Sequence, residues 1–348
     1  MQLWIGRILA SLSVLAGAGF GLAHADNNYN LLKTYPFGLA PASTGEYFDY
    51  VTVDPVARRV YLSRGTAVEV MNADTGALIG YVTGFKRQHG VALAREFGRG
   101  FISDGGLAQI TIFDLTTLKS LGVVKADPDA DCIVYDPASR RVLSMNGDSK
   151  SSTVLDAKTG QLVKTIALGG APEFAVADGN GIVYANLADK NQIIAIDTRT
   201  LEIKSRWATA PSGQPTALAI DPQHHRLFAA GRNPQVLIVM DADSGKIIQS
   251  FPISSGTDAA AFDADTNDIF VSTREGKIHV FHEDSPNAYS VVGTVDTQFG
   301  AKTMGLDLQT HHLYLDTTDF RASRASGSAS GQRTAVPNSF RVLVYGRQ

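Results

Sequence analysis

Short hydrophobic runs separated by polar turns recur along the chain. The stretch Ile182–Ile203 shows the pattern, with a β-branched and aromatic run, a polar turn, a second run, a turn opened by Asp197, and a third run. Runs of this length, with alternating side chains and turn residues at their ends, predict β-strands. Nothing in the stretch sustains the 3.6-residue period of an amphipathic helix. The pattern therefore predicts an all-β chain.

The strands repeat at an almost constant interval. A strand that ends in Asp recurs at Asp54, Asp136, Asp178, Asp221, Asp263 and Asp307, and Ala94 holds the place between the first two. The end of a later strand in each unit recurs at Asn72, Asp114, Asp156, Asp197, Asp241 and His282. Both series have a spacing of about 42 residues, which is the size of a four-stranded propeller blade. Seven first positions predict a single seven-bladed β-propeller with strands a to d in each blade, numbered from the inside outward.

The two ends of the chain predict how the ring closes. The last blade reaches its strand c at Phe340–Tyr345, and no strand d follows. The segment Asn30–Pro36 resembles the strand d segment Gln161–Ile166, so we expect the N-terminal strand to complete the seventh blade and remove the open edge. Residues 319–339, rich in Ser, Ala, Gly and Arg, break the period, and we expect a flexible loop between strands b and c of this blade.

The first 25 residues are typical of a signal peptide. Arg7 supplies a positive charge, residues 8–23 form a weakly apolar run, and Ala23-His24-Ala25 fits a cleavage site. The run is short for a membrane span, which needs roughly 20 apolar residues. We therefore expect an exported protein of the bacterial periplasm, a propeller of residues 26–348 and no membrane span after cleavage. We also expect a monomer.

Composition excludes some classes of partner and bond. The chain has 348 residues, 44% of them hydrophobic and 19% charged, which is ordinary for a folded protein. Its formal net charge of −3 argues against a protein built to hold a phosphate backbone. The single cysteine, Cys132, allows no internal disulfide and lies in an apolar run where it is expected to be buried.

The repeat carries a family resemblance. The segment Val-Tyr-Ala-Asn…Ile-Ala-Ile-Asp-Thr-Arg-Thr (183–200), followed by Gly-Gln-Pro (213–215), resembles the YVTN-repeat family of exported, surface-layer-type seven-bladed propellers. The resemblance extends over essentially the whole chain after residue 25. It implies the fold but no particular chemistry, because propellers of this kind bind different things. The chain contains no Trp-Asp dipeptide, so it does not resemble the WD40 type.

Candidate chemistry is concentrated at the start of strand a, the innermost strand. The residues five positions before each first repeat position are Asp49, His89, Asp131, Glu173, Thr216, Asp258 and Lys302. We call these seven residues the ring. Six of them are ionisable, and we expect them to surround the mouth of the central channel.

The ring leaves three interpretations open. Its side chains could be simply solvated or paired with Lys302, or Asp49, His89, Asp131, Glu173 and Asp258 could hold a divalent cation. Carboxylates suit Ca²⁺ or Mg²⁺, and His89 beside them would admit Zn²⁺ or Mn²⁺. In the third interpretation these five residues and Lys302 bind a small polar ligand.

Two function classes follow from these interpretations. The first is a binding or scaffold module that recognises a polar ligand or a partner protein at the channel mouth. The second is a metal-dependent hydrolase of the lactonase type, in which the ring holds the cation that polarises a carbonyl. The loops between strands b and c lack the aromatic residues that stack on single-stranded nucleic acid, so nucleic acid is not an expected partner.

The position of a charged residue in the repeat also predicts on which face of the disc it lies. A basic rim on the channel-mouth face is predicted from Arg64, Lys150, Lys190, Arg232, Arg274, Arg321, Arg324 and Arg333. The pairs His224-His225 and His311-His312 fall in turns between strands a and b, on the opposite face, and are interpreted as turn residues.

Overall fold

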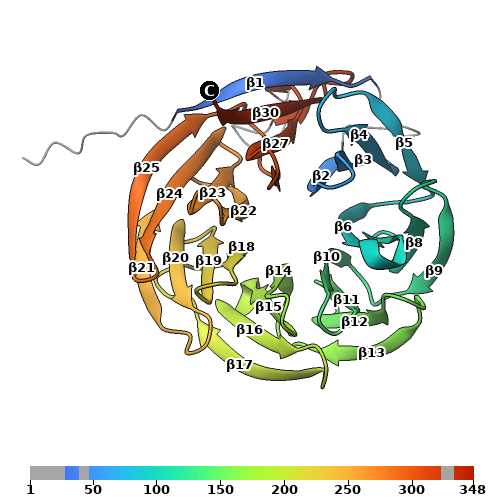
Figure 1. Ribbon diagram of the computed structural model, residues 1–348, viewed down its shortest axis with the longest axis horizontal. Helices are drawn as coiled ribbons and strands as arrows, with labels where there is room; N and C mark the ends of the chain where they lie inside the picture. The colour runs from blue at the N-terminus through green and yellow to red at the C-terminus, as the bar shows by residue number, and fades with distance from the viewer. Residues whose placement is uncertain (1–27, 39–46, 323–332) are drawn as a thin grey trace, which may run out of the picture.

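Seven four-stranded antiparallel sheets surround a central channel in the computed structural model (Figure 1). The structure describes residues 28–38, 47–322 and 333–348. The signal peptide predicted for residues 1–25 lies outside these ranges. Each strand a contacts strand a of both neighbouring blades, and contacts between β2 and β26 close the circle. The predicted fold class is confirmed.

The blades follow one another along the chain. Blade 1 contains β2 (Phe48–Asp54), β3 (Arg59–Arg64), β4 (Ala67–Asn72) and β5 (Leu78–Thr83). Blade 2 contains β6 (Gln88–Ala94), the 3₁₀ turn η1 (Arg95–Phe97), β7 (Arg99–Asp104), β8 (Gln109–Asp114) and β9 (Ser120–Lys125). Blade 3 contains β10 (Ala130–Asp136), β11 (Arg141–Asn146), β12 (Ser151–Asp156) and β13 (Leu162–Ala167). Blade 4 contains β14 (Pro172–Ala177), β15 (Ile182–Leu187), η2 (Ala188–Lys190), β16 (Gln192–Asp197) and β17 (Glu202–Ala208).

The remaining three blades include the one that closes the ring. Blade 5 contains β18 (Pro215–Asp221), β19 (Arg226–Gly231), β20 (Val236–Asp241) and β21 (Ile247–Pro252). Blade 6 contains β22 (Thr257–Asp263), β23 (Asp268–Thr273), β24 (Lys277–Ser285) and β25 (Ala288–Asp296). Blade 7 contains β26 (Met304–Asp307), β27 (His312–Thr317), β30 (Arg341–Arg347) and the N-terminal strand β1 (Tyr29–Pro36).

Strand β1 completes blade 7, as predicted. It pairs antiparallel with β30, from Tyr29 opposite Arg347 to Pro36 opposite Arg341. Tyr29 is buried and donates a hydrogen bond to Asp268 of blade 6, 3.0 Å away. Since Arg347 also pairs with Asp268, both strands at this seam are fastened to the neighbouring blade.

The Asp residues that end strand c in blades 3 and 5 have a structural role, because they cap the turn that follows. Asp156 Oδ1 accepts hydrogen bonds from the backbone and side chain of Thr159, and Asp241 caps its turn through Ser244 in the same way. The predicted ends of strand c at Asn72, Asp114, Asp156, Asp197 and Asp241 are confirmed, whereas strand c of blade 6 continues beyond His282 to Ser285. Strand a of blade 4 ends at Ala177, one residue before the predicted Asp178, and strand c of blade 7 runs to Arg347 instead of Tyr345. Blade 6 lacks the Asp-x-x-Thr/Ser-Gly turn of blades 3 and 5, so its outer hairpin is longer.

The arms of the insertion in blade 7 are ordered, contrary to the expectation of an unstructured loop for residues 319–339. Strands β28 (Phe320–Ala322) and β29 (Arg333–Ala335) pair as a short hairpin. At the base of this hairpin, Asp319 forms an ion pair with Arg341 at 2.6 Å. Residues 323–332 lie outside the described part of the chain.

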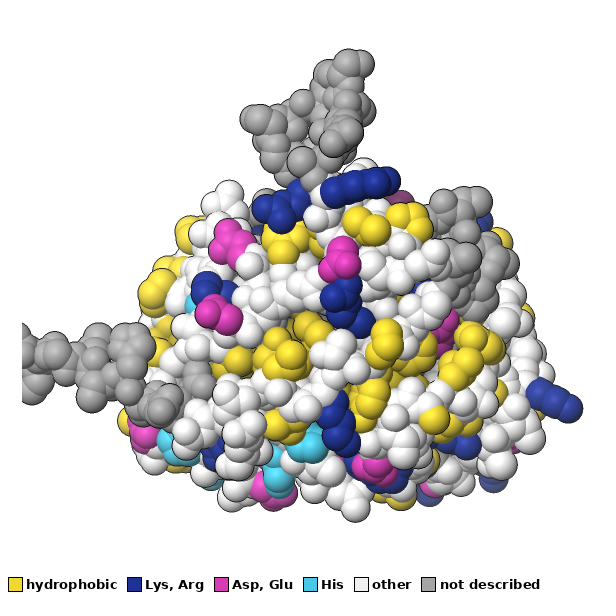
Figure 2. Space-filling view, turned by 90° about the horizontal axis from the view of Figure 1, so that it is seen from above, with side chains coloured by type: hydrophobic (Ala, Val, Ile, Leu, Met, Phe, Trp, Pro, Cys, Tyr) yellow, Lys and Arg dark blue, Asp and Glu magenta, His cyan; other side chains and the backbone are white. Residues whose placement is uncertain are grey.

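Hydrophobic side chains fill the spaces between neighbouring blades. Cys132 is buried in one of these clusters, as expected. Most exposed large hydrophobic residues lie on the outermost strands, and Figure 2 shows them among charged side chains on the circumference of the disc. Within the described ranges, no helix is long and apolar enough to cross a membrane.

Candidate functional site at the channel mouth

A β-bulge places six of the seven ring residues at the channel mouth, and the seventh, Lys302, lies just before β26. In blades 1 to 6 the pairing of strands a and b shifts register at the start of strand a, for example between Phe48 and Val51 and between Gln88 and Val91. The skipped residues include Asp49 and His89, and the other four blades repeat this arrangement. A bulge bends the strand and redirects a side chain, so the ring side chains can leave the sheet.

The neighbouring blade fixes the backbone at these bulges. Ser63 of blade 1 donates a hydrogen bond to the carbonyl of His89 in blade 2, and Ser103 of blade 2 donates to Asp131 in blade 3. Thr303 of blade 7 donates to the carbonyl of Asp49 in blade 1 at 2.6 Å. The ring positions are therefore set by contacts between blades.

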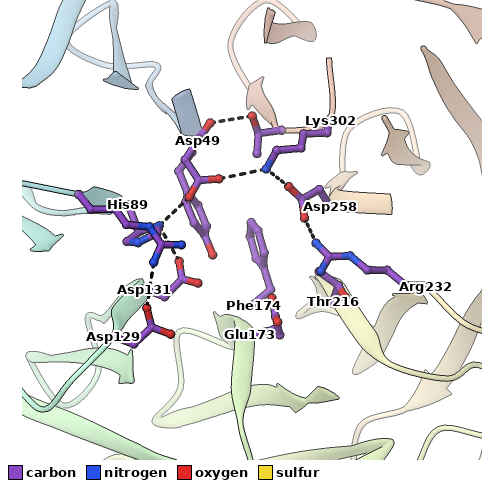
Figure 3. A pocket seen from close by; sticks show the side chains of 13 residues that line it. Asp49, His89, Asp129, Asp131, Glu173, Phe174, Thr216, Arg232, Asp258 and Lys302 are labelled. Atoms are coloured by element: carbon purple, nitrogen blue, oxygen red, sulfur yellow. Dashed lines mark hydrogen bonds and ion pairs between the residues drawn. The ribbon is translucent and has the colours of Figure 1, made fainter. Parts of the chain in front are cut away.

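All seven ring residues line one cavity of about 280 Å³ (Figure 3). The other lining residues are Tyr50, Arg87, Asp129, Phe174, Arg232 and Thr303. The structure thus brings together every site residue predicted from the repeat. This volume is at the lower limit for a small-molecule site.

A continuous chain of ion pairs crosses one side of the cavity. Lys302 Nζ lies between Asp49, at 3.2 Å, and Asp258, which also pairs with Arg232. Burial opposes the charge on Lys302, but the two carboxylates outweigh it and raise its pKa. Burial likewise opposes the charge on Asp49, but Lys302 and His89 lower its pKa to about 2. Lys302 and Asp49 therefore stay charged at neutral pH and neutralise each other.

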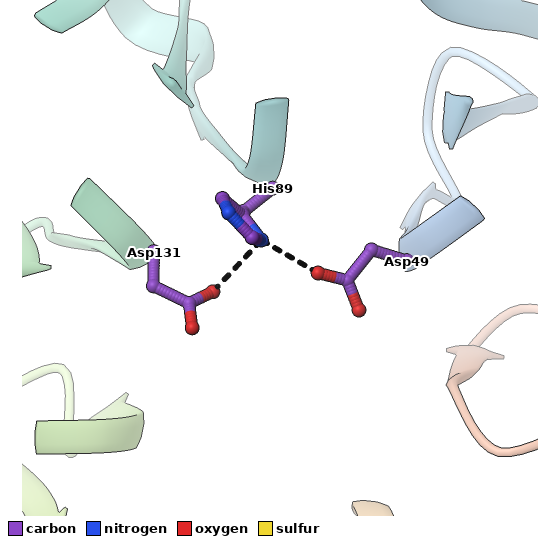
Figure 4. A group of neighbouring side chains, drawn as sticks. All are labelled: Asp49, His89 and Asp131. Atoms are coloured by element: carbon purple, nitrogen blue, oxygen red, sulfur yellow. Dashed lines mark hydrogen bonds and ion pairs between the residues drawn. The ribbon is translucent and has the colours of Figure 1, made fainter. Parts of the chain in front are cut away.

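His89 links this chain to Asp131 (Figure 4). Its Nδ1 lies 2.6 Å from Asp49 Oδ2 and 3.3 Å from Asp131 Oδ1. Burial opposes protonation of the imidazole, but the hydrogen bond to Asp49 and the charge of Asp131 raise its pKa. The Nε2 atom of His89 has no hydrogen-bond partner among the described residues.

Glu173 stands apart from these pairs. Its carboxyl group makes no hydrogen bond or ion pair with any residue in the described ranges, and no dashed line reaches it in Figure 3. Burial and the charge of Asp131 raise the pKa of Glu173 to about 7. Burial also raises the pKa of Asp131, to about 6, although His89 opposes the shift. Arg232 partly opposes the rise in the pKa of Glu173 but pairs with Asp258, so Glu173 has no cationic partner of its own among the described residues.

Several residues that line the cavity were not predicted from the sequence, although each lies within two positions of a ring residue. Arg87 and Asp129 lie two residues before the ring positions of their blades and pair across the rim at 3.6 Å. Tyr50 and Phe174 directly follow ring positions, and their rings lie 5.0 Å apart at an angle of 30°. Examining the neighbours of each ring position, as well as the position itself, would have identified all four.

The basic rim predicted for this face is only partly correct. Arg64 is buried rather than exposed, pairs with Glu69 at 3.3 Å, and lies 4.1 Å from the ring centroid of Phe340. Arg333 stacks on Phe299, and Lys150 pairs with Asp189. Arg232 does reach the cavity, whereas Arg324 lies outside the described residues.

The arrangement offers two kinds of chemistry. Asp49, His89 and Asp131 bring one imidazole nitrogen and two carboxylate oxygens within 4.8 Å of one another, as a divalent cation would require. However, Lys302 and protonated His89 already supply positive charge to Asp49, so a metal would have to displace the Lys302 ammonium group and the His89 proton. Glu173 and the aromatic rings beside it are free of such pairing and suit an organic cation.

Comparisons with known proteins establish the fold alone. No family model matches the sequence, and no curated protein matches it either. A chain from the "Crystal Structure of Mitotic Checkpoint Complex" is 13% identical with a TM-score of 0.71, over 97% of this chain and 98% of that chain. The RRP9 WD40 repeats are 8% identical with a TM-score of 0.73, over 92% and 98%. A chain of Kuenenia stuttgartiensis hydrazine synthase is 12% identical with a TM-score of 0.66, over 80% and 96%. The chain is thus similar in structure to seven-bladed and WD40-type propellers.

Proposed function

We propose that the protein is a binding module whose channel mouth takes a small ligand carrying a positively charged amine. The observation that carries the proposal is the unpaired carboxyl group of Glu173 in a cavity whose other carboxylates have cationic partners. A bound ammonium group would supply the cationic partner that Glu173 lacks. The cavity of about 280 Å³ fits a ligand of a few heavy atoms rather than a folded partner.

Two further features support an organic cation. Tyr50 and Phe174 lie beside Glu173 in the cavity wall, and aromatic rings attract ammonium groups by about 0.5–2 kcal/mol. The ion-pair chain through Lys302 holds the opposite wall in place, which favours binding because little has to be ordered on association.

The test compares three probes of the same size, n-butylamine, 1-butanol and butanoate, by chemical-shift titration of the whole protein. Butylamine is expected to bind, and the alcohol and the carboxylate are not. Glu173→Gln removes the unpaired charge without changing the shape of the side chain, so it should weaken butylamine binding at least tenfold, about 1.4 kcal/mol. Equal binding of the amine and the alcohol would contradict the proposal.

The matched control is Glu275→Gln. Glu275 lies on the same face, in the turn between β23 and β24, and accepts a hydrogen bond from Ser255, but it does not line the cavity. This variant should bind butylamine as the wild type does. If both Gln variants lose binding equally, the amine is attracted by the charge of the whole face and not by the cavity.

Proton release provides an independent readout. Because the pKa of Glu173 is raised to about 7, and a bound cation would lower it, binding should release protons near neutral pH. Calorimetry in two buffers with different ionisation enthalpies should show this release, and affinity should rise as the pH passes from 6 to 8. Absence of linkage in the wild type would exclude Glu173 as the binding group.

The hydrolase alternative predicts a different outcome. In that case Mn²⁺ or Ca²⁺ would bind at Asp49, His89 and Asp131, and lactones would be hydrolysed only when the metal is present. The geometry favours the binding module, because Lys302 and His89 already neutralise this wall of the cavity. Lactone turnover that Asp131→Asn abolishes would replace our proposal with the alternative.

We also infer that the chain is an exported member of the YVTN-repeat family. The inference rests on the repeat text at 183–200 and on the signal-peptide pattern of residues 1–25. Expression of the full chain in a bacterium, followed by cell fractionation and N-terminal sequencing, tests it. A periplasmic protein that begins at Asp26 supports export, whereas an intact cytoplasmic chain contradicts it.

A further inference from the structure

Two carboxylates and one imidazole meet at the boundary of blades 5 and 6, on the face opposite the channel mouth. Asp221 ends β18, His224 lies in the turn that follows, and Glu283 comes from the long strand β24. His224 Nδ1 lies 2.7 Å from Asp221 Oδ2 and 2.9 Å from Glu283 Oε1. His224 lies in a turn, as predicted, but Asp221 and Glu283 are 62 positions apart in the chain, so the sequence did not indicate this contact.

Glu283 is a buried carboxyl group without a hydrogen-bond partner among the described residues. Its side chain is 2% exposed, and neither carboxylate oxygen has a hydrogen-bond partner among the residues that the structure describes. His224 Nδ1 makes its hydrogen bond to Asp221 instead. One nitrogen carries at most one proton, so it cannot donate to both carboxylates. An isolated buried carboxylate is costly, which points to a missing positive group.

Arg226 does not supply that group. Its charge acts on Glu283, but its guanidinium pairs with Asp241 at 2.8 Å. Its remaining hydrogen bonds go to the backbone carbonyls of His224, His225 and Pro286 and to the side chain of Asn287.

Other blade boundaries show what this one lacks. Arg58 of blade 1 pairs with Asp307 of blade 7 at 2.6 Å, and Arg95 of blade 2 pairs with Asp54 of blade 1 at 2.8 Å. His311 of blade 7 pairs with Asp263 of blade 6 at 2.8 Å. In each case the turn between strands a and b of the next blade supplies a guanidinium or an imidazole to the Asp that ends strand a.

Blade 6 supplies no such cation to Asp221. The position equivalent to Arg58 and His311 is Asn267, whose backbone carbonyl accepts a hydrogen bond from the Glu283 amide at 2.8 Å. A second carboxylate, that of Glu283, therefore faces Asp221 where the three boundaries described above place a guanidinium or an imidazole. Asp221 is 1% exposed, so solvent does not neutralise it.

We propose that Asp221, His224 and Glu283 form a zinc site that fastens blade 5 to blade 6. A Zn²⁺ ion would balance both carboxylates while His224 coordinates as a neutral imidazole. A mixed set of nitrogen and oxygen ligands suits Zn²⁺, whereas Ca²⁺ and Mg²⁺ prefer oxygen alone.

The geometry needs only a small adjustment. Ligand atoms about 2.0–2.2 Å from a tetrahedral zinc lie roughly 3.3 Å from one another, so the donor atoms would move apart by about 0.5 Å. The side chain of His224 is 34% exposed, which leaves space for a water molecule as the fourth ligand. The backbone N–H of Gln223 donates a hydrogen bond to Asp221 Oδ1 at 2.9 Å and so orients that carboxylate.

The first experiment titrates chelator-treated, full-length protein with ZnCl₂ by calorimetry. The wild type should bind one Zn²⁺ at this site, and CaCl₂ should not compete. Mutating a residue that only hydrogen-bonds to a metal ligand typically lowers metal affinity by about 10–100-fold. Loss of a ligand itself, in Glu283→Gln or His224→Gln, should therefore lower zinc affinity by at least about 100-fold.

Two matched controls locate the site. His311→Gln alters the Asp–His pair at the next boundary, where the third acidic group, Asp265, is exposed, and it should leave zinc affinity unchanged. His89→Gln alters the cluster at the channel mouth and should also leave this binding event intact. Zinc binding that survives Glu283→Gln but is lost in His89→Gln would overturn the proposal and assign the ion to the channel mouth.

Thermal unfolding separates a zinc ligand from an ordinary ion-pair partner. Without metal, Glu283→Gln should unfold at the same or a higher temperature than the wild type, because it removes a buried charge. Zinc should raise the unfolding temperature of the wild type but not of the variant. A lower unfolding temperature for the metal-free variant, together with no zinc binding by the wild type, would overturn the proposal and leave a Glu283–His224 ion pair.

Discussion

Glu173 and Lys302 occupy the same position in their blades but have opposite electrostatic surroundings. Lys302 lies between two carboxylates that raise its pKa despite burial. Glu173 has carboxylates as neighbours and no paired cation, so burial and Asp131 raise its pKa to about 7. Residue identity alone therefore does not predict the charge at a ring position. The neighbours around the ring, brought together from different blades, decide it.

The raised pKa of Glu173 predicts how stability depends on pH. The folded protein holds the proton up to about pH 7, whereas the unfolded chain releases it near the ordinary value of 4.5. The folded state therefore binds more protons between these values, and stability falls as the pH rises through this window. Glu173→Gln removes this contribution, so the variant should lose less stability between pH 5 and pH 8, by on the order of 1–3 kcal/mol.

Urea unfolding at pH 5 and pH 8 measures the effect. Asp131, whose pKa is raised to about 6, contributes with the same sign, so Asp131→Asn should also flatten the dependence. Identical pH dependence in the wild type and both variants would show that these carboxyls do not titrate as their surroundings require.

At the scale of elements, the features that could be predicted from the sequence are those that follow from the repeat. A constant period is enough to count strands, to identify equivalent positions, and to assign the innermost ones to the channel. Contacts that depend on one particular blade had no such signal. Arg64 was assigned to the rim because it ends a strand b, yet Phe340 from blade 7 covers it. Glu283 was missed because only blade 6 has a long outer hairpin.

The β-bulges were equally invisible in the sequence. They occur at six ring positions with no common residue type, since the skipped residues range from Asp49 to Thr216. The bulge is specified by packing between blades and by hydrogen bonds such as that from Thr303 to the Asp49 carbonyl. The pattern of polar and hydrophobic residues predicts neither the packing between blades nor these hydrogen bonds.

The hairpin of β3 and β4 depends on the buried Arg64–Glu69 pair. Arg64→Met should destabilise the protein by about 3–5 kcal/mol, because Glu69 stays buried after losing its cationic partner. Adding Glu69→Gln should recover much of this loss, since the second change removes the buried charge. Chemical unfolding of both variants measures the difference. A double variant no more stable than Arg64→Met would show that packing of the Arg64 side chain on Phe340 dominates.

At the scale of the whole molecule, a single strand decides whether the ring is closed. Strand β1 supplies strand d of blade 7, and Tyr29 reaches across to blade 6. Blade 7 without β1 would expose one edge of β30 and uncover the core cluster that contains Tyr29. The contribution of β1 is therefore shared by two blades.

Removing residues 1–46 should lower the midpoint of thermal unfolding in one cooperative transition. We expect the free energy of unfolding to fall by several kcal/mol. In a large domain, each kcal/mol lowers the unfolding midpoint by about 2–4 °C. Removing only residues 1–27 is the control and should leave the midpoint unchanged, because β1 begins at Tyr29. Calorimetry distinguishes the two, and equal midpoints for both truncations would show that β1 does not stabilise the ring.

The direction of the β1–β30 pairing has a mechanical consequence. Tyr29 lies opposite Arg347, so the outer ends of the two strands leave the disc at the same place. A force that pulls them apart would load the hydrogen bonds one pair at a time, as in unzipping, rather than all together, as in shear. The contacts of Tyr29 and Arg347 with Asp268 lie at the start of this path and would break first. Under tension the disc would therefore open at its circumference, while the strands around the channel mouth still hold their places.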